Sequence, residues 1–308
     1  MLISRRRADA HLPGFWEFPG GKCAAEEPAR AALDRELREE LGVEVRQATQ
    51  ILSIPHDYPG CRVELLVFRV DAWAGRPQAR EAQPLRWAAP GELAGLPFPD
   101  ASRAIVNAAR LPVFYLISPD PASGGERTEA VRRVSRRLAQ GDIRLLQIRA
   151  PRLGQGEFLD YARQLMDAAA QHSVQVLVNA PDAWRMQLPP AGCHLPERRL
   201  RTQISRPHCD GWLAASVHDL DGLQRASALP VDFVVAGPVE PTRTHPDARP
   251  IGVDAFGGLC AQASCPVFAL GGLGPRDVER VRQVGAQGVA GISGLLEMPP
   301  GRWGEDAG

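Results

Sequence analysis

Three glutamates, Glu36, Glu39 and Glu40, stand at i, i+3 and i+4 shortly before Gly42. On a helix this spacing places their carboxylates on neighbouring faces, where like charges repel by roughly a few tenths of a kcal/mol per pair. A hard cation removes that repulsion, and Mg²⁺ prefers one or two carboxylates together with substrate phosphates. The sequence therefore predicts a divalent-metal site suited to phosphate chemistry, with a solvated acidic helix face as the alternative.

The residues around these glutamates predict the helix that carries them. Pro28 suits a first helical position, and Gly42 suits the residue just past a helix end. An apolar stripe repeats every four residues, at Ala29, Leu33, Leu37 and Leu41. We therefore expect one helix from about Glu27 to Leu41, with this stripe buried.

The stretch from Gly21 to Val43, GKCAAEEPARAALDRELREELGV, reads G-x5-E-x7-R-E-U-x-E-E-x-G-U, where U is apolar. It is identified as a Nudix box. From Met1 to about Arg110 the chain resembles the MutT branch of the Nudix family, through LISRRRADAH, GFWEFPGGK, EAQPLRW and LPFPDAS. The resemblance implies an α/β/α sandwich that hydrolyses a nucleoside triphosphate, such as 8-oxo-dGTP, to a monophosphate and pyrophosphate. It also implies Mg²⁺ as the cofactor, with Mn²⁺ able to use the same oxygen ligands.

The same resemblance implies roles for individual residues. Metal ligands would be the main-chain carbonyl of Gly20 with Glu36, Glu39, Glu40 and Glu81. Catalytic roles fall to Glu36, Glu39 and Glu81, the last as a further ligand or base. The nucleotide would be bound by Arg6 and His11 at its phosphates and by Glu17, Phe18, Pro19, Gly20, Tyr58 and Ser102.

Two features depart from the family pattern. Ser102 stands where the family has a purine-reading Asn, and a hydroxyl lacks the simultaneous donor and acceptor of a carboxamide. Selectivity for an oxidised guanine is therefore open. In addition, Leu2, Ile3 and Ser4 align with the second strand of the family's sheet, and the first strand has no counterpart. A missing strand leaves an unpaired sheet edge. We therefore expect the natural start to lie about seventeen to twenty residues upstream of Met1.

Composition is typical of two globular domains of an intracellular protein. The chain has 308 residues, 44% hydrophobic and 23% charged, which is enough for two cores. Its six cysteines include no C-x-x-C pair, which indicates buried thiols in the cytoplasm. No apolar run is long enough for a membrane span. Lys plus Arg equals Asp plus Glu at 36 each, which favours a small nucleotide over duplex nucleic acid as partner.

Beyond Leu111 the sequence alternates short apolar runs with helical patterns. The runs lie at 114–118, 144–149, 174–180, 192–195, 212–217, 231–239, 266–272 and 288–294. Helical patterns lie at 129–140, 158–172, 220–228 and 276–284. Eight strands with intervening helices predict a closed (β/α)₈ barrel, and an open doubly wound sheet is the alternative. We expect domains at 1–111 and 112–298 and a tail at 299–308.

The second domain also resembles a known family. FYLIS, LLQIR, VLVNA, GCHL, ASVHDLDGL, DFVVAGPVEPTRTH, PVFALGGLGPRDV and GVAGISGL, in this order, are similar to the thiamine phosphate synthase and TenI barrels. The resemblance implies a site for a phosphorylated thiazole or pyrimidine. Its residues would be Gln147, Arg149, Asn179, Ser216, Thr242, Thr244, Gly271, Gly272, Ile292 and Ser293.

The barrel departs from its family at the positions of catalysis. Pro151 and His245 replace expected lysines, while Ala180 and Arg199 replace two metal-binding Asp residues. Pro238 replaces the histidine that TenI proteins use. His218 is expected at the barrel mouth, either as a functional ionisable group or as a hydrogen-bonded structural histidine. We therefore expect little synthase activity. Two further functions stay open: hydrolysis of a diphosphate of thiamine metabolism, and a barrel that serves as a phosphate-ligand sensor or docking module.

Overall fold

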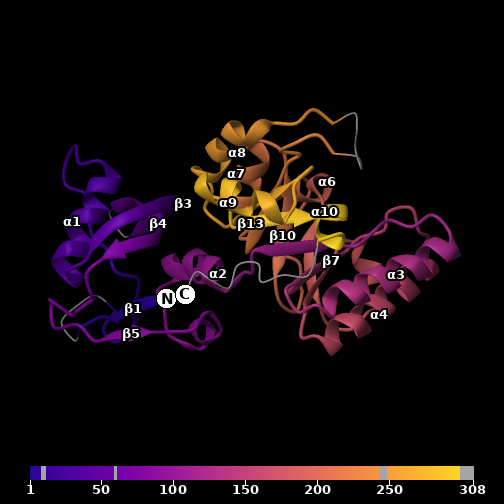
Figure 1. Ribbon diagram of the computed structural model, residues 1–308, viewed down its shortest axis with the longest axis horizontal. Helices are drawn as coiled ribbons and strands as arrows, with labels where there is room; N and C mark the ends of the chain where they lie inside the picture. The colour runs from indigo at the N-terminus through magenta and orange to yellow at the C-terminus, as the bar shows by residue number, and fades with distance from the viewer. Residues whose placement is uncertain (8–11, 59–60, 243–247, 299–308) are drawn as a thin grey trace. The chain divides into compact units, whose positions relative to one another are not determined.

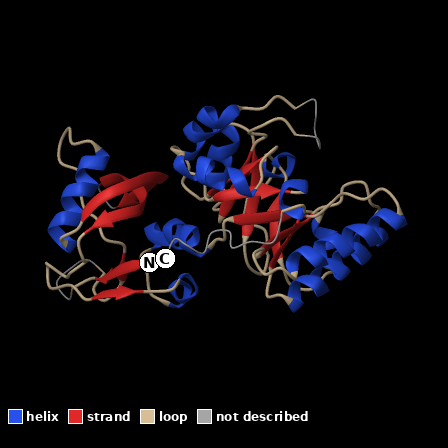
Figure 2. Ribbon diagram, in the orientation of Figure 1, coloured by secondary structure: helices blue, strands red, loops and turns tan. Residues whose placement is uncertain are grey.

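The computed structural model describes residues 1–7, 12–58, 61–242 and 248–298 (Figure 1). The chain divides into two compact units, Met1–Leu111 and Pro112–Gly308. Each unit mixes helices and strands, as Figure 2 shows, and each is described by itself below. In the described residues no helix combines the length and the apolar character that a membrane crossing requires.

The first unit contains a three-stranded sheet and a long hairpin. Strand β1 (Leu2–Arg5) is the central strand of the sheet and pairs antiparallel with β2 (Trp16–Glu17) and with β5 (Leu85–Trp87). Strands β3 (Glu44–Tyr58) and β4 (Cys61–Ala74) form the antiparallel hairpin. Two residues, Gly42 and Val43, separate this hairpin from the helix that carries Glu36, Glu39 and Glu40, so the hairpin follows that helix almost directly.

The side chains of β1 point alternately to the two faces of the sheet and pack into two small cores. Ile3 is fully buried against Val106 of helix α2 (Arg103–Arg110) and the short 3₁₀ helix η1 (Pro90–Gly95). Leu2 packs on the opposite face, against Leu37 of helix α1 (Ala29–Leu41). Because successive side chains of a strand point to opposite faces, one strand serves both cores. The sheet thus lies between α1 and α2, which confirms the α/β/α sandwich.

Helix α1 is bounded by Pro28 at its start and by Gly42 at its end. Pro28, predicted as the first helical residue, is instead the N-cap with extended backbone, and the helix begins at Ala29. Gly42 ends the helix in the left-handed conformation at φ 71°, where its N–H bonds back to Arg38. The buried face consists of Ala32, Leu37 and Leu41, with Leu33 partly buried; Ala29, predicted in the stripe, is only half-buried. The helix turns the opposite face, with its glutamates, outward.

The second unit is a closed barrel of eight parallel strands. The strands are β6 (Phe114–Ile117), β7 (Leu145–Ile148), β8 (Gln175–Val178), β9 (Gly192–Leu195), β10 (Leu213–Val217), β11 (Phe233–Ala236), β12 (Val267–Leu270) and β13 (Gly288–Gly291). Their order is β10-β11-β12-β13-β6-β7-β8-β9. Strand β13 pairs with β6 and closes the ring, so the barrel is confirmed and the open sheet is excluded.

Helices connect the barrel strands along the chain, and the long pair α3 and α4 pack against each other (Figure 1). The helices are α3 (Gly124–Leu138), α4 (Gln155–Gln171), α5 (Asp182–Arg185), α6 (Glu197–Leu200), α7 (Leu220–Ala228), α8 (Gly252–Cys260), α9 (Val278–Gln283) and α10 (Ser293–Leu296). The 3₁₀ turn η3 (Pro275–Asp277) precedes α9. A further 3₁₀ turn, η2 (Asp100–Ser102), belongs to the first unit and precedes α2. The free thiols of Cys193, Cys260 and Cys265 are buried, whereas Cys23 is exposed, contrary to the expectation of buried cysteines throughout.

Candidate active site

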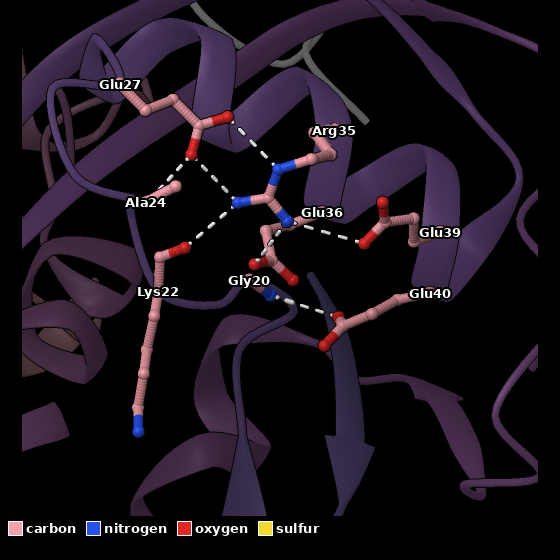
Figure 3. Close-up of polar contacts among 8 residues, drawn as sticks. All are labelled: Gly20, Lys22, Ala24, Glu27, Arg35, Glu36, Glu39 and Glu40. Carbon is pink, nitrogen blue, oxygen red and sulfur yellow. Dashed lines mark hydrogen bonds and ion pairs between the residues drawn. The ribbon is translucent and has the colours of Figure 1, made fainter.

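The turn between β2 and α1 lies against the acidic face of α1 (Figure 3). Gly20 adopts φ 146°, a conformation that favours glycine, and its N–H donates to Glu40 Oε2 at 3.1 Å. A Cβ on Gly21 would lie 2.2 Å from the Glu36 carboxyl carbon, so a side chain there would displace this carboxylate from its present position. The two glycines therefore bring main-chain groups into contact with two of the three glutamates.

Arg35 organises one side of the site. Its guanidinium contacts the Glu27 carboxylate at 2.9 and 3.0 Å, Glu36 Oε1 at 2.8 Å and Glu39 Oε2 at 3.4 Å. It also donates to the Lys22 carbonyl at 2.9 Å, which fixes the turn on the helix. The Arg35 hydrogen bonds lower the pKa of Glu27 to about 2. Sequence reasoning assigned no role to Glu27 or Arg35, although both are specified positions of the motif.

Glu40 lies where negative charge is least compensated. Burial is the main cause that raises the pKa of its carboxyl group to about 7; the charges of Glu81, Glu36 and Glu17 act in the same direction, and the Gly20 N–H acts against them. A carboxyl group whose ionised form is this disfavoured gains from a nearby cation. The surroundings of Glu40 therefore fit a divalent metal.

The oxygen donors that converge here are few. Glu36 is 16% exposed and Glu40 half-buried, whereas Glu39 is 57% exposed and turns toward Arg35 (Figure 3). Among the described residues, no three His, Cys, Asp or Glu side chains are arranged to hold a metal by themselves. Glu36, Glu40 and the Gly20 carbonyl could supply part of a shell and leave positions for phosphate oxygens and water, the usual arrangement for Mg²⁺.

The predicted nucleotide-binding residues of the described chain lie at or just after the ends of β1 and β2 and just before α2. Arg6 Nε contacts Glu17 Oε2 at 2.7 Å. Phe18 stacks on Phe98 with ring centroids 5.3 Å apart, a partner that sequence reasoning missed although it lies in the LPFPDAS segment. Ser102 immediately precedes α2, and its side chain makes no capping bond. His11 and the side chain of Tyr58 lie outside the described residues.

In the barrel, a buried polar network lies at the C-terminal ends of the strands. Tyr115 Oη and Gln147 Nε2 both lie 3.2 Å from His194 Nδ1, and His194 Nε2 lies 2.8 Å from Ser216 Oγ. Asn179 Nδ2 donates to Gln147 Oε1 at 3.1 Å. Burial, together with the charge of Arg149, lowers the pKa of His194 to about 3, so this imidazole is neutral near pH 7. The network joins three of the predicted ligand residues, Gln147, Asn179 and Ser216.

The residues at the expected barrel metal site do not fit a metal. Arg199 Nη1 donates to the Ala180 carbonyl at 3.0 Å, and its Nη2 contacts Asp182 Oδ2 at 2.8 Å. Asp182 Oδ1 is bound in turn by Arg185 at 3.0 Å. A guanidinium thus takes the oxygen atoms that a cation would need, and its own charge repels one.

The other predicted barrel residues occupy neighbouring loops. Gly271 and Gly272 have φ of 102° and 68°, and a Cβ on Gly272 would lie 2.4 Å from the Pro241 carbonyl. Ile292 precedes α10, which Ser293 begins, and Thr242 is half-buried. Thr244 and His245 lie outside the described residues.

His218 belongs to a separate ion pair at the barrel mouth. Its Nδ1 lies 2.6 Å from Glu197 Oε2, and its side chain is 53% exposed. Hydrogen bonds from Arg201, and then from His218, lower the pKa of Glu197. The pair holds α6 to the end of β10, which supports the structural interpretation of this histidine.

Comparison with known proteins matches each unit separately. Residues 1–108 match the family model described as NUDIX domain, and residues 114–295 match the one described as thiamine monophosphate synthase. Over 106 residues the chain is 33% identical to the 8-oxo-dGTP diphosphatase of Escherichia coli, spanning 34% of this chain and 82% of that protein.

Two further relatives widen the comparison. The CTP pyrophosphohydrolase of Escherichia coli is 36% identical over 108 residues, which are 35% of this chain and 80% of that protein. A putative thiamine-phosphate synthase 2 of Aquifex aeolicus is 27% identical over 188 residues, which are 61% of this chain and 99% of that protein. Both units therefore match their relatives over most of the relatives' length.

Proposed function

Because the chain belongs to the Nudix family through residues 1–108 and to the thiamine monophosphate synthase family through residues 114–295, we propose that it is a divalent-metal-dependent nucleoside triphosphate pyrophosphohydrolase with a fused barrel of little synthase activity. The relatives that act on 8-oxo-dGTP and on CTP support a nucleotide substrate for the first unit. The products would be a nucleoside monophosphate and pyrophosphate, and the role clearance of an abnormal nucleotide.

The observation that carries this proposal is the Glu40 carboxylate, held by Gly20 among uncompensated negative charges. Glu36, Glu40 and the Gly20 carbonyl would hold Mg²⁺ or Mn²⁺, and Glu39 would join them on leaving Arg35. The bound ion would neutralise phosphate charge and activate water.

The chain's own residues would do the rest of the chemistry. Arg6 would contact the phosphates on leaving Glu17, and Phe18 with Phe98 would pack beside the base. The exposed Glu81 carboxylate, whose charge acts on Glu40, would accept a proton from the attacking water or complete the metal shell. Water would add to phosphorus while the bridging P–O bond breaks toward pyrophosphate.

A pyrophosphate-release assay tests this proposal. The full chain would be assayed with Mg²⁺ on 8-oxo-dGTP, dGTP, CTP and thiamine diphosphate, alongside Glu40→Gln and the control Glu44→Gln on the exposed start of β3. We expect turnover of nucleotides by the wild type and by Glu44→Gln, and a loss of at least about a hundredfold in Glu40→Gln. Turnover confined to thiamine diphosphate would replace the substrate class, and unchanged turnover in Glu40→Gln would refute the site.

A second function is proposed for the barrel alone. The Arg199 contacts exclude metal from the position that its family uses, while the polar network around His194 and the glycine turns remain. This combination favours a non-catalytic sensor of a phosphorylated ligand. In EDTA, thiazole phosphate should raise the melting temperature of the second unit. In a separate assay with Mg²⁺ and the pyrimidine diphosphate, the chain should form no thiamine phosphate. A hundredfold excess over Kd would contribute about 2.7 kcal/mol. Product formation would instead show a working synthase.

A further inference from the structure

The C-terminal end of α1 is closed by a single loop that runs from Gln78 to Gln83. The last carbonyl groups of a helix have no partners within it. Here the Leu41 carbonyl accepts from Gln78 N at 3.0 Å, and the Glu40 carbonyl accepts from Arg80 N at 3.0 Å. Arg80 Nη1 donates to the Arg38 carbonyl at 3.1 Å. The loop is therefore attached to the same turn of helix that carries Glu39 and Glu40.

Gln83 is the buried centre of this attachment. It is 8% exposed, unlike Gln78 in the same loop, whose side chain is exposed. Its Oε1 accepts from Glu81 N at 3.0 Å, and its Nε2 donates to the Glu40 carbonyl at 3.4 Å. A carboxamide can accept and donate at once, so one side chain connects the main chain of Glu81 with that of Glu40.

This connection matters because the carboxylates of Glu81 and Glu40 repel each other. The charge of Glu81 acts directly on Glu40, while Glu81 itself stands exposed on a loop. An untethered loop would relieve the repulsion by moving its carboxylate into solvent. Holding two like charges together requires attachments of the main chain, and Gln83 supplies two of them.

We propose that Gln83 is a positioning residue, which sets the Glu81 carboxylate beside Glu40 through its two hydrogen bonds and so completes the hydrolytic site. This inference rests on the proposed hydrolase function. It predicts that Gln83 acts only through Glu81. Removal of its amide should therefore alter metal binding and turnover when Glu81 is present and have no further effect when the Glu81 carboxylate is already gone.

A double-mutant cycle on the full chain tests this prediction. The four proteins are the wild type, Gln83→Leu, Glu81→Gln and the double variant, each assayed for kcat and KM on CTP and 8-oxo-dGTP. We expect Gln83→Leu to lower kcat by about tenfold with KM changed less than about twofold, and to add nothing in the Glu81→Gln background. Gln78→Leu, the same change at an exposed side chain of the loop, should behave as wild type.

A second readout keeps the test independent of turnover. Free Mn²⁺, followed by electron paramagnetic resonance, gives the Mn²⁺ affinity of the same four proteins. We expect Gln83→Leu to weaken it by at least about threefold, again only when Glu81 is intact. If wild type hydrolyses no nucleotide, the proposed function fails, and the Mn²⁺ cycle still decides the role of Gln83.

The outcome that would overturn the inference is additivity. Equal losses from Gln83→Leu in both backgrounds, or no change in either readout, would make Gln83 a packing residue only. Should Gln83→Leu not fold, Gln83→Asn replaces it in the cycle, because that side chain keeps a carboxamide but is too short by one methylene group to reach both partners. Its losses should likewise occur only when Glu81 is intact.

Discussion

Glu40 shows how far one carboxyl group depends on its surroundings. Its two neighbours in the helix motif, Glu36 and Glu39, are bound by Arg35, whereas Glu40 accepts the main-chain N–H of Gly20. Partial burial without a compensating cation raises its pKa to about 7, compared with the usual 4.5. The carboxyl group that we propose as a metal ligand is thus also one whose ionisation is disfavoured in the folded protein.

The first prediction follows from the sign of this shift. A carboxyl group with a raised pKa stabilises the fold fully below pH 4.5, and this contribution is lost as pH rises through about 7. In EDTA, the melting temperature of the first unit should therefore fall between pH 5 and pH 8 more in wild type than in Glu40→Gln. Mg²⁺ should restore it at pH 8 in wild type alone. A difference between the two proteins that does not vary with pH would contradict this.

The second prediction concerns base selectivity at Ser102. Its hydroxyl offers one donor with a short reach, whereas a carboxamide can donate and accept along a purine edge. Ser102→Asn should raise the ratio of kcat/KM for 8-oxo-dGTP over dGTP by about tenfold, or about 1.4 kcal/mol. Ser102→Ala provides the control, and it should leave the ratio within about twofold. An unchanged ratio in Ser102→Asn would place base recognition elsewhere, for example at Phe18 and Phe98.

At the scale of the elements, helix ends and close strand contacts set the geometry of both sites. The end of α1 is fixed by Gly42 and by the loop from Gln78 to Gln83. In the barrel, closure depends on the approach of β13 to the start of β6, where Val289 N donates to the Val113 carbonyl at 2.9 Å. A Cβ on Gly288 would meet the backbone of Val113, whereas one on Gly42 would meet the Arg80 guanidinium and would also be strained by the φ of 71°.

The third prediction tests barrel closure. A Cβ on Gly288 would lie 2.0 Å from the Val113 carbonyl oxygen, and a backbone atom cannot rotate away. Gly288→Ala should therefore destabilise the barrel by about 2–3 kcal/mol in chemical denaturation. The matched change Gly258→Ala, in helix α8 with nothing within 4 Å of the new Cβ, should be neutral or stabilise by about 0.5–1 kcal/mol. Equal effects of the two changes would refute the strand-contact explanation.

At the scale of the whole molecule, the chain combines two compact units with separate cores. The first buries apolar residues on both faces of its sheet, and the second surrounds its own strand interior. Every residue assigned to hydrolysis lies in Met1–Leu111, and none is contributed by the barrel. Hydrolysis should therefore not require the second unit.

The fourth prediction states this as an experiment. The fragment 1–111 should retain kcat within about threefold of the full chain on the same nucleotide, measured by pyrophosphate release. Glu40→Gln in the full chain should abolish turnover even though the barrel is intact. If the fragment is folded by circular dichroism but inactive, the barrel contributes to hydrolysis, and a ligand of the barrel should then alter the rate in the full chain.

The sequence by itself determined some of the elements and part of their chemistry. The spacing of Glu36, Glu39 and Glu40 specified a helix with an acidic face, because helical periodicity is local. Gly42 specified where it ends, and eight apolar runs specified eight buried strands. The substitutions Ala180 and Arg199 already indicated the loss of a barrel metal site. The first three of these follow from residue type and spacing along the chain, and the last from the resemblance to the thiamine phosphate synthase family.

Only the tertiary structure decided which side chains meet. It closed the barrel by pairing β13 with β6, placed Glu39 against Arg35, and left Glu40 half-buried beside the Gly20 N–H. It also joined Gln83 to Glu40 across 43 positions of the chain and His194 to Ser216 across 22. Sequence patterns report neighbours within a few residues, whereas burial, pKa and hydrogen-bond partners depend on segments that packing alone brings together.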